Sequence, residues 1–537
     1  MPMTKIETKL TALVLTTLAC SLPLTGGCGE RGEWVDERPE LLGGPVAPVA
    51  LGETLVLVEA SKHSALLMQP DSDNDPKVVE LPHGPIQMLL RNGAPEALVL
   101  SQGLRANAEE KAEPAALTAL DADGKTRIYE LGNPFNRLSQ SDDGRYAFLY
   151  KSNLSERLLD NPNEVAVIDL DASPDGGGAI SLRTLRSFGD SPERIVFSPT
   201  MTIVGEERRL SLVLSQTNVT LLDLDHLDRR ETTVQLSGSG GPLVQPSQVV
   251  FSETEPVLYV RGEGSDDVFV FNLAERPGGS AAVDEEGEHN DFRPFINQLG
   301  VGSDPSDMAL YESADGPRLL VVAAGSQQIA IVEADTSQVT QIPLPARARN
   351  LLLFEGTSPR DDRVAQRALL YESGNPTVTF LDLEDAEQEK SRNLDTLRLD
   401  APFDRLIPML DEGMVLVVHD GSGISLIDLA DRTVSPIRSS QQLNDAFVDR
   451  ARRKLWVGPQ GQPRIGSLAF DTGETDELLL DAPVRSLVPM LDAGRLAVVH
   501  ENAAGHITWI DADNPVRESA TSVRGFLFTD LFDREDP

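Results

Sequence analysis

The feature that most constrains the fold of this chain is an internal repeat of about 49 residues. The clearest copies are Arg405–His419 and Arg485–His500, whose shared prolines, Pro408 and Pro489, stand 81 residues apart. A weaker copy at residues 444–457 lies between them, so 81 residues correspond to two units. Repeats of about 40 to 50 residues are typical of β-propellers, in which each unit forms one blade.

A short β-rich run that ends in a polar residue, usually an acid, marks the units. It ends at Asp169, Asp223, Glu333, Asp382, Asp428, Asp471 and Asp511, with weaker copies at Gln69, Asp121 and Asn272. The seven steps from Asp169 to Asp511 have a mean length of about 49 residues. An aspartate at the end of a strand can accept a hydrogen bond from the backbone two residues on. We therefore interpret these acids as turn formers, not as catalytic carboxylates.

Each unit has the pattern of four short strands. Around Asp223, residues 194–198, 210–215 and 219–223 are rich in apolar side chains, and residues 231–236 alternate polar and apolar ones, as an outer strand does. Helical patterns are scarce. The sequence predicts an all-β fold, a β-propeller of about ten four-stranded blades, in one ring or in two smaller rings. A single ring of ten would be unusually large, since 4–8 blades are typical.

A propeller must also close the seam between its first and last blades, because an open seam exposes unpaired strand edges. Gly43–Val49 contains two prolines and is a poor candidate for the innermost strand of the first unit. Residues 525–532 form an apolar run after the tenth unit is complete. We expect residues 525–532 to pair inside the first blade, beside residues 54–58, so that the C-terminal strand closes one ring.

The strand–Asp–turn–strand pattern of Leu468–Leu480 is similar to the YVTN-type, lactonase-like propeller repeats of bacterial envelope proteins. The resemblance covers roughly residues 50–532 and supports the fold more than any activity. The chain has three tryptophans, Trp34, Trp456 and Trp509, so the tryptophan-docking repeats of quinoprotein-type propellers are absent. This absence argues against a quinone cofactor.

The chain begins like an exported protein. Met1–Lys9 carries two lysines, and the mainly apolar stretch that follows is too short for a membrane-spanning helix but suits a secretory signal. Leu24–Gly29 then resembles the lipobox of bacterial lipoproteins, in which small residues precede the cysteine that receives the lipid. That cysteine is Cys28 here. The alternatives are lipidation at Cys20 and an ordinary cleaved signal without a lipid.

Both cysteines of the chain, Cys20 and Cys28, lie in this leader. Cleavage before Cys28 would leave one thiol, at the new N-terminus, where lipid attachment gives it a use. We predict a lipoprotein signal peptide at residues 1–27, a lipid-anchored tether at residues 28–48 and a β-propeller repeat domain at residues 49–537. Gly29 replaces the aspartate that often marks inner-membrane retention in such lipoproteins, so the resemblance implies anchoring to the outer membrane.

The formal net charge of the chain is −38. Such a surface repels phosphate backbones, so we expect no nucleic-acid partner. It is also repelled by anionic lipid headgroups, which makes the lipid anchor the expected contact with the membrane. Cations and basic proteins remain plausible partners.

The sequence carries no recognisable catalytic motif. It contains no Gly-x-Ser-x-Gly nucleophile elbow, P-loop or dinucleotide fingerprint. His500 and His506 are spaced by six residues rather than four, so they do not share a helical face as zinc-protease histidines do. His419 and His500 hold equivalent positions in the repeat, which predicts a structural role for both.

Asp71, Asp73 and Asp75 are the best candidate metal ligands in the sequence. Alternating carboxylates are how calcium loops present oxygen ligands. However, Pro76 stands at the sixth position, where such loops prefer glycine, and Pro82 stands at the twelfth, where they place a bidentate glutamate. A solvated turn is the competing interpretation. Apart from this calcium site, we expect no cofactor.

These observations favour a non-enzymatic, envelope-anchored propeller that acts as a binding or scaffold module for an unidentified envelope protein. Propellers offer a wide rigid face and loops of free sequence, which suit partner binding. The alternative is a lactonase-like or other metal-dependent hydrolase with a metal in the central channel.

Overall fold

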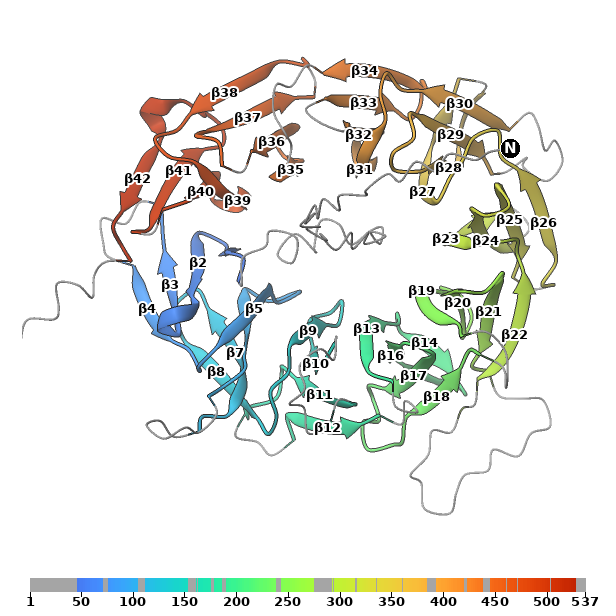
Figure 1. Ribbon diagram of the computed structural model, residues 1–537, viewed down its shortest axis with the longest axis horizontal. Coiled ribbons are helices and arrows are strands. Elements are labelled where there is room, and N and C mark those ends of the chain that lie inside the picture. The colour runs from blue at the N-terminus through green and yellow to red at the C-terminus, as the bar shows by residue number, and fades with distance from the viewer. Residues whose placement is uncertain are drawn as a thin grey trace, which may run out of the picture.

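The computed structural model describes residues 46–527, with gaps. The gaps are residues 71–75, 105–111, 153–160, 162, 175–177, 186–189, 238–242, 275–291, 293, 314–315, 335, 360, 384–392, 420–422, 438–444, 460, 471 and 503. In this part of the chain, the strands form ten four-stranded antiparallel sheets and one two-stranded hairpin. The ten sheets are arranged as the blades of a single ring around a central channel (Figure 1). The predicted all-β propeller is confirmed, and the two-ring alternative is wrong.

Each blade is built from consecutive strands, ordered from the channel outward. Blades 1 to 5 contain β1 (Val49–Leu51), β2 (Thr54–Glu59), β3 (Ser64–Met68), β4 (Lys77–Glu80); β5 (Pro85–Leu90), β6 (Glu96–Ser101), β7 (Ala115–Asp121), β8 (Thr126–Leu131); β9 (Arg137–Gln140), β10 (Tyr146–Tyr150), β11 (Glu164–Asp169), β12 (Ile180–Thr184); β13 (Pro192–Phe197), β16 (Leu210–Ser215), β17 (Asn218–Asp223), β18 (Thr232–Gln235); and β19 (Gln245–Phe251), β20 (Val257–Glu263), β21 (Asp267–Asn272), β22 (Phe295–Gly300). A hairpin of β14 (Met201–Ile203) and β15 (Glu206–Arg208) is inserted in blade 4.

The second half of the ring follows the same plan. Blades 6 to 10 contain β23 (Pro305–Ser313), β24 (Gly316–Ala323), β25 (Gln328–Glu333), β26 (Val339–Pro343); β27 (Asn350–Ser358), β28 (Asp361–Tyr371), β29 (Thr377–Asp382), β30 (Leu394–Arg398); β31 (Phe403–Met409), β32 (Met414–His419), β33 (Ile424–Asp428), β34 (Thr433–Ile437); β35 (Asp445–Asp449), β36 (Lys454–Gly458), β37 (Arg464–Ala469), β38 (Thr475–Leu479); and β39 (Val484–Met490), β40 (Arg495–His500), β41 (His506–Asp511), β42 (Thr521–Arg524). Single 3-10 turns occur at η1 (Ala60–Lys62), η3 (Leu410–Glu412), η4 (Leu491–Ala493) and η5 (Arg517–Ser519). None of the described helices is long and apolar enough to cross a lipid bilayer.

The hydrophobic core lies between neighbouring blades. The second and third strands are apolar on both faces because each is covered by a blade on either side, as the fully buried strand β16 illustrates. The outermost strands are more polar, and β22 has no buried residue. One core cluster joins Leu98 of blade 2 to Leu149 and Ile168 of blade 3, and similar clusters join the blades around the ring.

The aspartates that end the third strands form turns, as their position predicts. Asp169 Oδ1 accepts a hydrogen bond from the backbone N–H of Asp171 at 3.0 Å. Asp428 Oδ1 accepts one from Ala430 at 2.9 Å, and Asp511 Oδ1 accepts one from Asp513 at 2.9 Å. Asp471 lies outside the described residues. At these three positions, the carboxylate serves the turn into the outermost strand.

Proline begins several innermost strands, contrary to the expectation drawn from Gly43–Val49. Pro85, Pro192 and Pro305 each form the first ladder pair of an innermost strand, and Pro246 forms the second pair of β19; each is followed at once by a β-bulge. Proline is tolerated at the first residue of a strand and at bulges because no ladder N–H is needed there. The first unit accordingly has its own innermost strand, β1, directly after Pro48.

The predicted pairing of residues 525–532 beside residues 54–58 is excluded at Leu55 and Val56, which pair with β1 on one edge and β3 on the other. The last described strand, β42, belongs to blade 10 and pairs with β41. The rest of the closure stays a prediction. Residues 528–537 lie outside the described part.

Among the described residues, blades 10 and 1 are joined by side-chain packing rather than by a strand of one blade that pairs within the other. Phe526 packs in one cluster with Leu55 and Met68 of blade 1 and Trp509 of blade 10. Lys62 Nζ also donates a hydrogen bond to the carbonyl of Leu527 at 3.1 Å. Blades 10 and 1 therefore pack against each other through apolar side chains, as other neighbouring blades do, and the C-terminal segment adds a contact. In Figure 1, β42 lies beside β4.

Candidate functional site

The central channel contains a cavity of about 1540 Å³. Innermost strands of eight blades, numbers 1 to 5 and 8 to 10, contribute residues to its wall. Figure 1 shows why: the first strand of each blade lies nearest the middle of the ring, and its channel-facing edge pairs with no other strand in the described part of the chain. A concave space bordered by many blades is the natural place to look for a binding site.

Much of the channel wall is apolar. Side chains of the innermost strands point toward the two neighbouring blades, and those that are only partly buried also border the channel. In β13, Ile195 is buried whereas Val196 is partly exposed, and in β5 Met88 is buried whereas Leu89 is partly exposed. Leu89 and Val196 both line the cavity, together with Val249 of β19. A ligand in the channel would therefore meet aliphatic side chains on several blades.

Several polar side chains on the innermost strands form hydrogen bonds to neighbouring blades. Gln87 Nε2 donates to the carbonyl of Leu138 at 3.1 Å, and the N–H of Leu138 donates to Gln87 Oε1 at 2.8 Å. Gln248 makes the same reciprocal pair with Met308 in the next blade, at 3.0 and 3.1 Å. Each glutamine thus bonds to an N–H and a carbonyl group on the free edge of the next innermost strand. These backbone groups would otherwise lack a partner at an exposed sheet edge.

Two further polar residues, one of them at the cavity wall, bridge blades. Gln140 Nε2 donates to the carbonyl of Leu90 at 2.6 Å, and its Oε1 accepts from the N–H of Asn92 at 2.9 Å. Asp307, the residue after the β-bulge of β23, accepts from the N–H of Leu351 at 2.8 Å. These hydrogen bonds hold neighbouring blades together.

The residue after the bulge is a functional position that the sequence analysis missed. The segments at residues 85–87, 192–194, 246–248 and 305–307 share the pattern Pro-x-polar, with the polar residues Gln87, Arg194, Gln248 and Asp307. This pattern is visible in the sequence and could have located the innermost strands. Proline usually interrupts a strand, so its place at the start of these strands hides the pattern.

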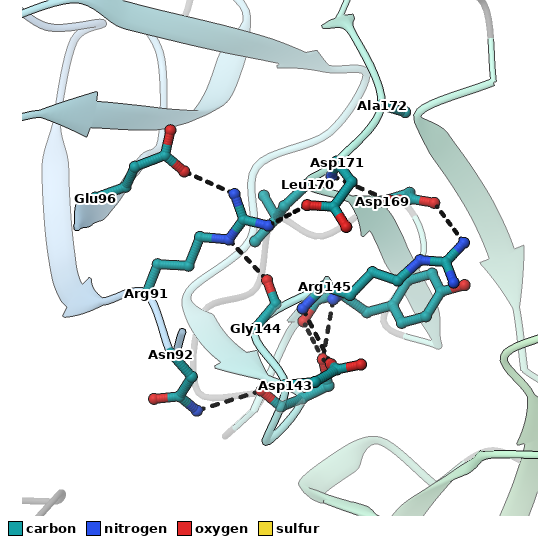
Figure 2. Close-up of polar contacts among 12 residues, drawn as sticks. Arg91, Asn92, Glu96, Asp143, Gly144, Arg145, Asp169, Leu170, Asp171 and Ala172 are labelled. Atoms are coloured by element: carbon teal, nitrogen blue, oxygen red, sulfur yellow. Dashed lines mark hydrogen bonds and ion pairs between the residues drawn. The ribbon is translucent and has the colours of Figure 1, made fainter. Parts of the chain in front are cut away.

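Arg91 lies at the centre of a polar network between blades 2 and 3 (Figure 2). Its side chain donates to Glu96 Oε2 at 2.7 Å, to Asp171 Oδ1 at 2.5 Å and to the carbonyl of Gly144 at 2.8 Å. Burial alone would lower the pKa of Arg91, but the hydrogen bonds with Glu96 and Asp171 outweigh it and the pKa is raised. Arg91 therefore remains a cation that ties two blades together.

The network continues from blade 3 to blade 4. Figure 2 shows Asp143 next to Arg145, whose backbone N–H donates to Asp143 Oδ1 at 3.0 Å. Burial opposes ionisation of Asp143, but hydrogen bonds from Ser141 and Arg145 and the charge of Arg209 lower its pKa. Arg209, in blade 4, forms an ion pair with Asp143. This charge cluster is a clamp between blades, since each group in it has a partner within the ring.

The repeat-equivalent histidines are bonded within their own blades. His500 Nδ1 lies 2.9 Å from the carbonyl of Ala482, and its Nε2 lies 2.8 Å from Thr508 Oγ1. His419 makes the matching contact with Ser425 Oγ at 2.8 Å. These contacts fit the structural role expected for both histidines.

His506 stacks on His500, with ring centroids 4.0 Å apart. Arg524 Nε donates to His506 Nε2 at 3.2 Å, which requires that nitrogen to be unprotonated. Burial, then the neighbouring His500 and Arg524, lower the pKa of His506 to about 4. Burial likewise lowers the pKa of His500. Both rings are therefore neutral at pH 7.

The lipidation and metal-binding residues predicted from the sequence are not among the residues that the structure describes. Cys28, Asp71, Asp73 and Asp75 all lie outside the described residues. Within the described part of the chain, no group of three or more His, Cys, Asp or Glu side chains is arranged to hold a metal ion. The lipidation and calcium sites stay predictions.

Comparison with known proteins gives structural similarities only. No protein-family description and no curated protein sequence matches the chain. A dihydro-heme d1 dehydrogenase, NirN, is similar over 80% of this chain and 74% of its own, with 12% identity and a TM-score of 0.39. A eukaryotic initiation factor is similar over 73% and 86%, with 13% identity and a TM-score of 0.40. AztD from Citrobacter koseri is similar over 73% and 96%, with 13% identity and a TM-score of 0.32. At such scores, these similarities carry no inference about function.

Proposed function

We propose that this protein is an exported, lipid-anchored binding module whose central channel holds a segment of a partner protein. The observation that carries the proposal is that polar side chains at the channel wall bond to neighbouring blades, which leaves aliphatic side chains facing the cavity. Gln87 and Gln140 bond to neighbouring blades, whereas Leu89 and Val196 present aliphatic surface to the cavity. A wall of this kind favours binding by burial of apolar surface.

The size of the cavity favours a polypeptide over a metabolite. Small-molecule sites typically enclose about 300–1,000 Å³, and the channel cavity is about 1540 Å³. A site bordered by eight blades can contact a chain segment along its length. The formal charge of −38 favours a partner that is neutral or basic.

The position of the first strand supports anchoring near a membrane. Ala47 and Pro48 line the cavity, so the predicted tether would join the ring at the channel wall. The 19 residues from Cys28 to Val46, joined by 18 peptide steps, can span at most about 65 Å. Lipidation at Cys28 would therefore hold the channel within that distance of the bilayer, where an envelope partner could reach it.

Site-specific photo-cross-linking in cells tests the proposal. A photoreactive amino acid at Leu89, in the channel wall, should cross-link one defined partner. The matched control is Phe295, which lies on the outermost strand β22 and is 43% exposed. Equal cross-linking from both positions, or none from Leu89, would overturn the proposal. Turnover of a lactone by the purified protein, dependent on a bound metal, would favour the hydrolase alternative.

A further inference from the structure

A second concave surface lies on the outside of the ring, between blades 1 and 2. It is a groove of about 600 Å³, bordered by Val79 and Glu80 of β4 and by Thr126, Ile128 and Glu130 of β8. Strands β4 and β8 are the outermost strands of their sheets, so each has a free edge. The two strands are neighbours on the rim in Figure 1.

The groove has an apolar floor. Leu81 and Ala116 are buried beneath it, and Pro82 and Pro114 also line it. Ile128 is 40% exposed at its side. A chain that lies in the groove would cover this side chain together with the floor.

Three carboxylates surround this floor: Glu80, Glu113 and Glu130. All three are exposed. The basic side chains nearby are directed elsewhere: Lys77 donates to the carbonyl of Asp123, and Arg127 bonds to Glu96 at 2.8 Å. His83 contacts the carboxylate of Glu113. The groove therefore combines apolar contact surface with negative charge.

The ends of the groove limit what can occupy it. At one end, the turn at Gly124 packs closely against Lys77 and Val79, since a Cβ on Gly124 would lie 2.9 Å from Lys77 Cε and 3.0 Å from a methyl group of Val79. At the other end are His83 and Glu113. An occupant must lie between the two strands, and an extended chain fits because its side chains alternate in direction.

We propose that this groove binds an extended segment of a partner protein in which basic and aliphatic residues alternate. The aliphatic side chains pack on Val79, Ile128 and the floor, and the basic side chains pair with Glu80 and Glu130 at the sides. The formal charge of −38 disfavours a second copy of this chain as the occupant. This inference concerns a surface separate from the channel and holds whether or not the channel binds a ligand.

Fluorescence anisotropy with defined peptides tests the proposal on the mature protein. The probe is a labelled seven-residue peptide of alternating lysine and valine. The comparison peptide has the same composition, with its lysines and valines in two blocks. We expect the alternating peptide to bind at least several-fold more tightly than the block peptide, because only the former places the two kinds of side chain on opposite faces. Equal binding of both peptides, or no binding of either, would overturn the proposal.

Matched triple variants separate the groove from general electrostatics. In the variant E80Q/E113Q/E130Q, affinity for the alternating peptide should fall about tenfold, since the ion pairs with Glu80 and Glu130 are lost together with the negative charge of Glu113. The control variant E474Q/D476N/E477Q removes the same charge around β38, beside Leu479, which is 60% exposed. The control should change affinity by less than about twofold. Equal losses in both variants would show non-specific attraction and refute the groove site.

Discussion

At the scale of single residues, His506 couples the last blade to pH. Its neutral ring accepts a hydrogen bond from Arg524 and stacks on His500, and its pKa is lowered to about 4 from the ordinary value of 6.5. In the unfolded chain this histidine would take up a proton near pH 6.5, whereas in the folded chain it resists protonation until about pH 4. Folding stability is therefore lost as the pH falls through this window.

The variant His506→Phe tests this coupling, since it keeps an aromatic ring and removes the titration. Between pH 6.5 and pH 4, the wild-type free energy of unfolding should fall by on the order of 2 kcal/mol more than that of the variant. Chemical denaturation at a series of pH values measures both. Parallel pH profiles would show that His506 does not carry the effect.

Gly144 shows how one residue constrains the joint between two blades. Its φ is +64°, and a Cβ there would lie 1.9 Å from the carbonyl oxygen of Asn92 in blade 2. Its own carbonyl accepts a hydrogen bond from Arg91 (Figure 2). Any side chain must therefore push the two blades apart.

We expect Gly144→Ala to destabilise the protein by about 3 kcal/mol, since it adds a backbone clash to the strain of a positive φ. The matched control is Gly205→Ala, where φ is +79° but nothing lies within 4 Å of the added Cβ. The control should cost only about 1 kcal/mol. Thermal unfolding of both variants gives the comparison, and equal losses would mean that the contact with Asn92 is unimportant.

At the scale of elements, the strands and turns could be predicted from the sequence, and the pairing of edges could not. Period-2 alternation and the aspartates that end the third strands are local properties, so Asp169, Asp428 and Asp511 form the turns predicted for them. Which strand edge remains free depends on the assembled ring. Pro48 therefore suggested a missing innermost strand, although β1 begins directly after it.

The residues of the channel wall could not be predicted from the sequence, because their exposure also depends on the assembled ring. Leu89 and Val196 resemble ordinary strand residues in the sequence, because their exposure depends on the register of each innermost strand. The bridging role of Gln87 depends on the position of the next blade, which no local pattern records. The Pro-x-polar pattern is the sequence signal that marks several of these innermost strands.

The glutamine bridges give a prediction at this scale. Gln87→Ala removes both hydrogen bonds to Leu138, at 3.1 and 2.8 Å, and should destabilise the protein by about 1–2 kcal/mol. The control is Ser486→Ala, at the equivalent position after the bulge of β39, where the buried hydroxyl has no hydrogen-bond partner among the described residues. That control should be nearly neutral. A neutral Gln87→Ala would show that the bridges do not hold the blades together.

At the scale of the whole molecule, ten consecutive blades form one ring, and no strand is exchanged at the seam among residues 46–527 as far as they are described. The ring exceeds the usual 4–8 blades, and a wider ring leaves space for a channel cavity of about 1540 Å³. Side-chain packing, to which Phe526 contributes, joins the two sides of the seam. Because Phe526 follows the last described strand, it links the end of the described chain to blade 1.

The variant Phe526→Ala tests the seam. Removing a buried aromatic side chain shared by blades 10 and 1 should destabilise the ring by about 3 kcal/mol. Phe295→Ala, on the outermost strand of blade 5, is the control and should cost less than about 1 kcal/mol. Differential scanning calorimetry measures both. If Phe526→Ala melts at the wild-type temperature, the seam closes without this contact.

The most direct test of the central claim, that the apolar channel wall binds a partner polypeptide, is to measure what co-purifies with the protein. The full-length protein would be isolated from its native membrane in wild-type form and as the variant Val196→Asp/Val249→Asp, which charges the wall on blades 4 and 5. Native mass spectrometry of both samples, after matched thermal melts confirm folding, gives the bound masses. We predict one partner polypeptide in stoichiometric amount on the wild-type protein and its loss from the variant. The same partner on both proteins, or none on the wild type, would contradict the account.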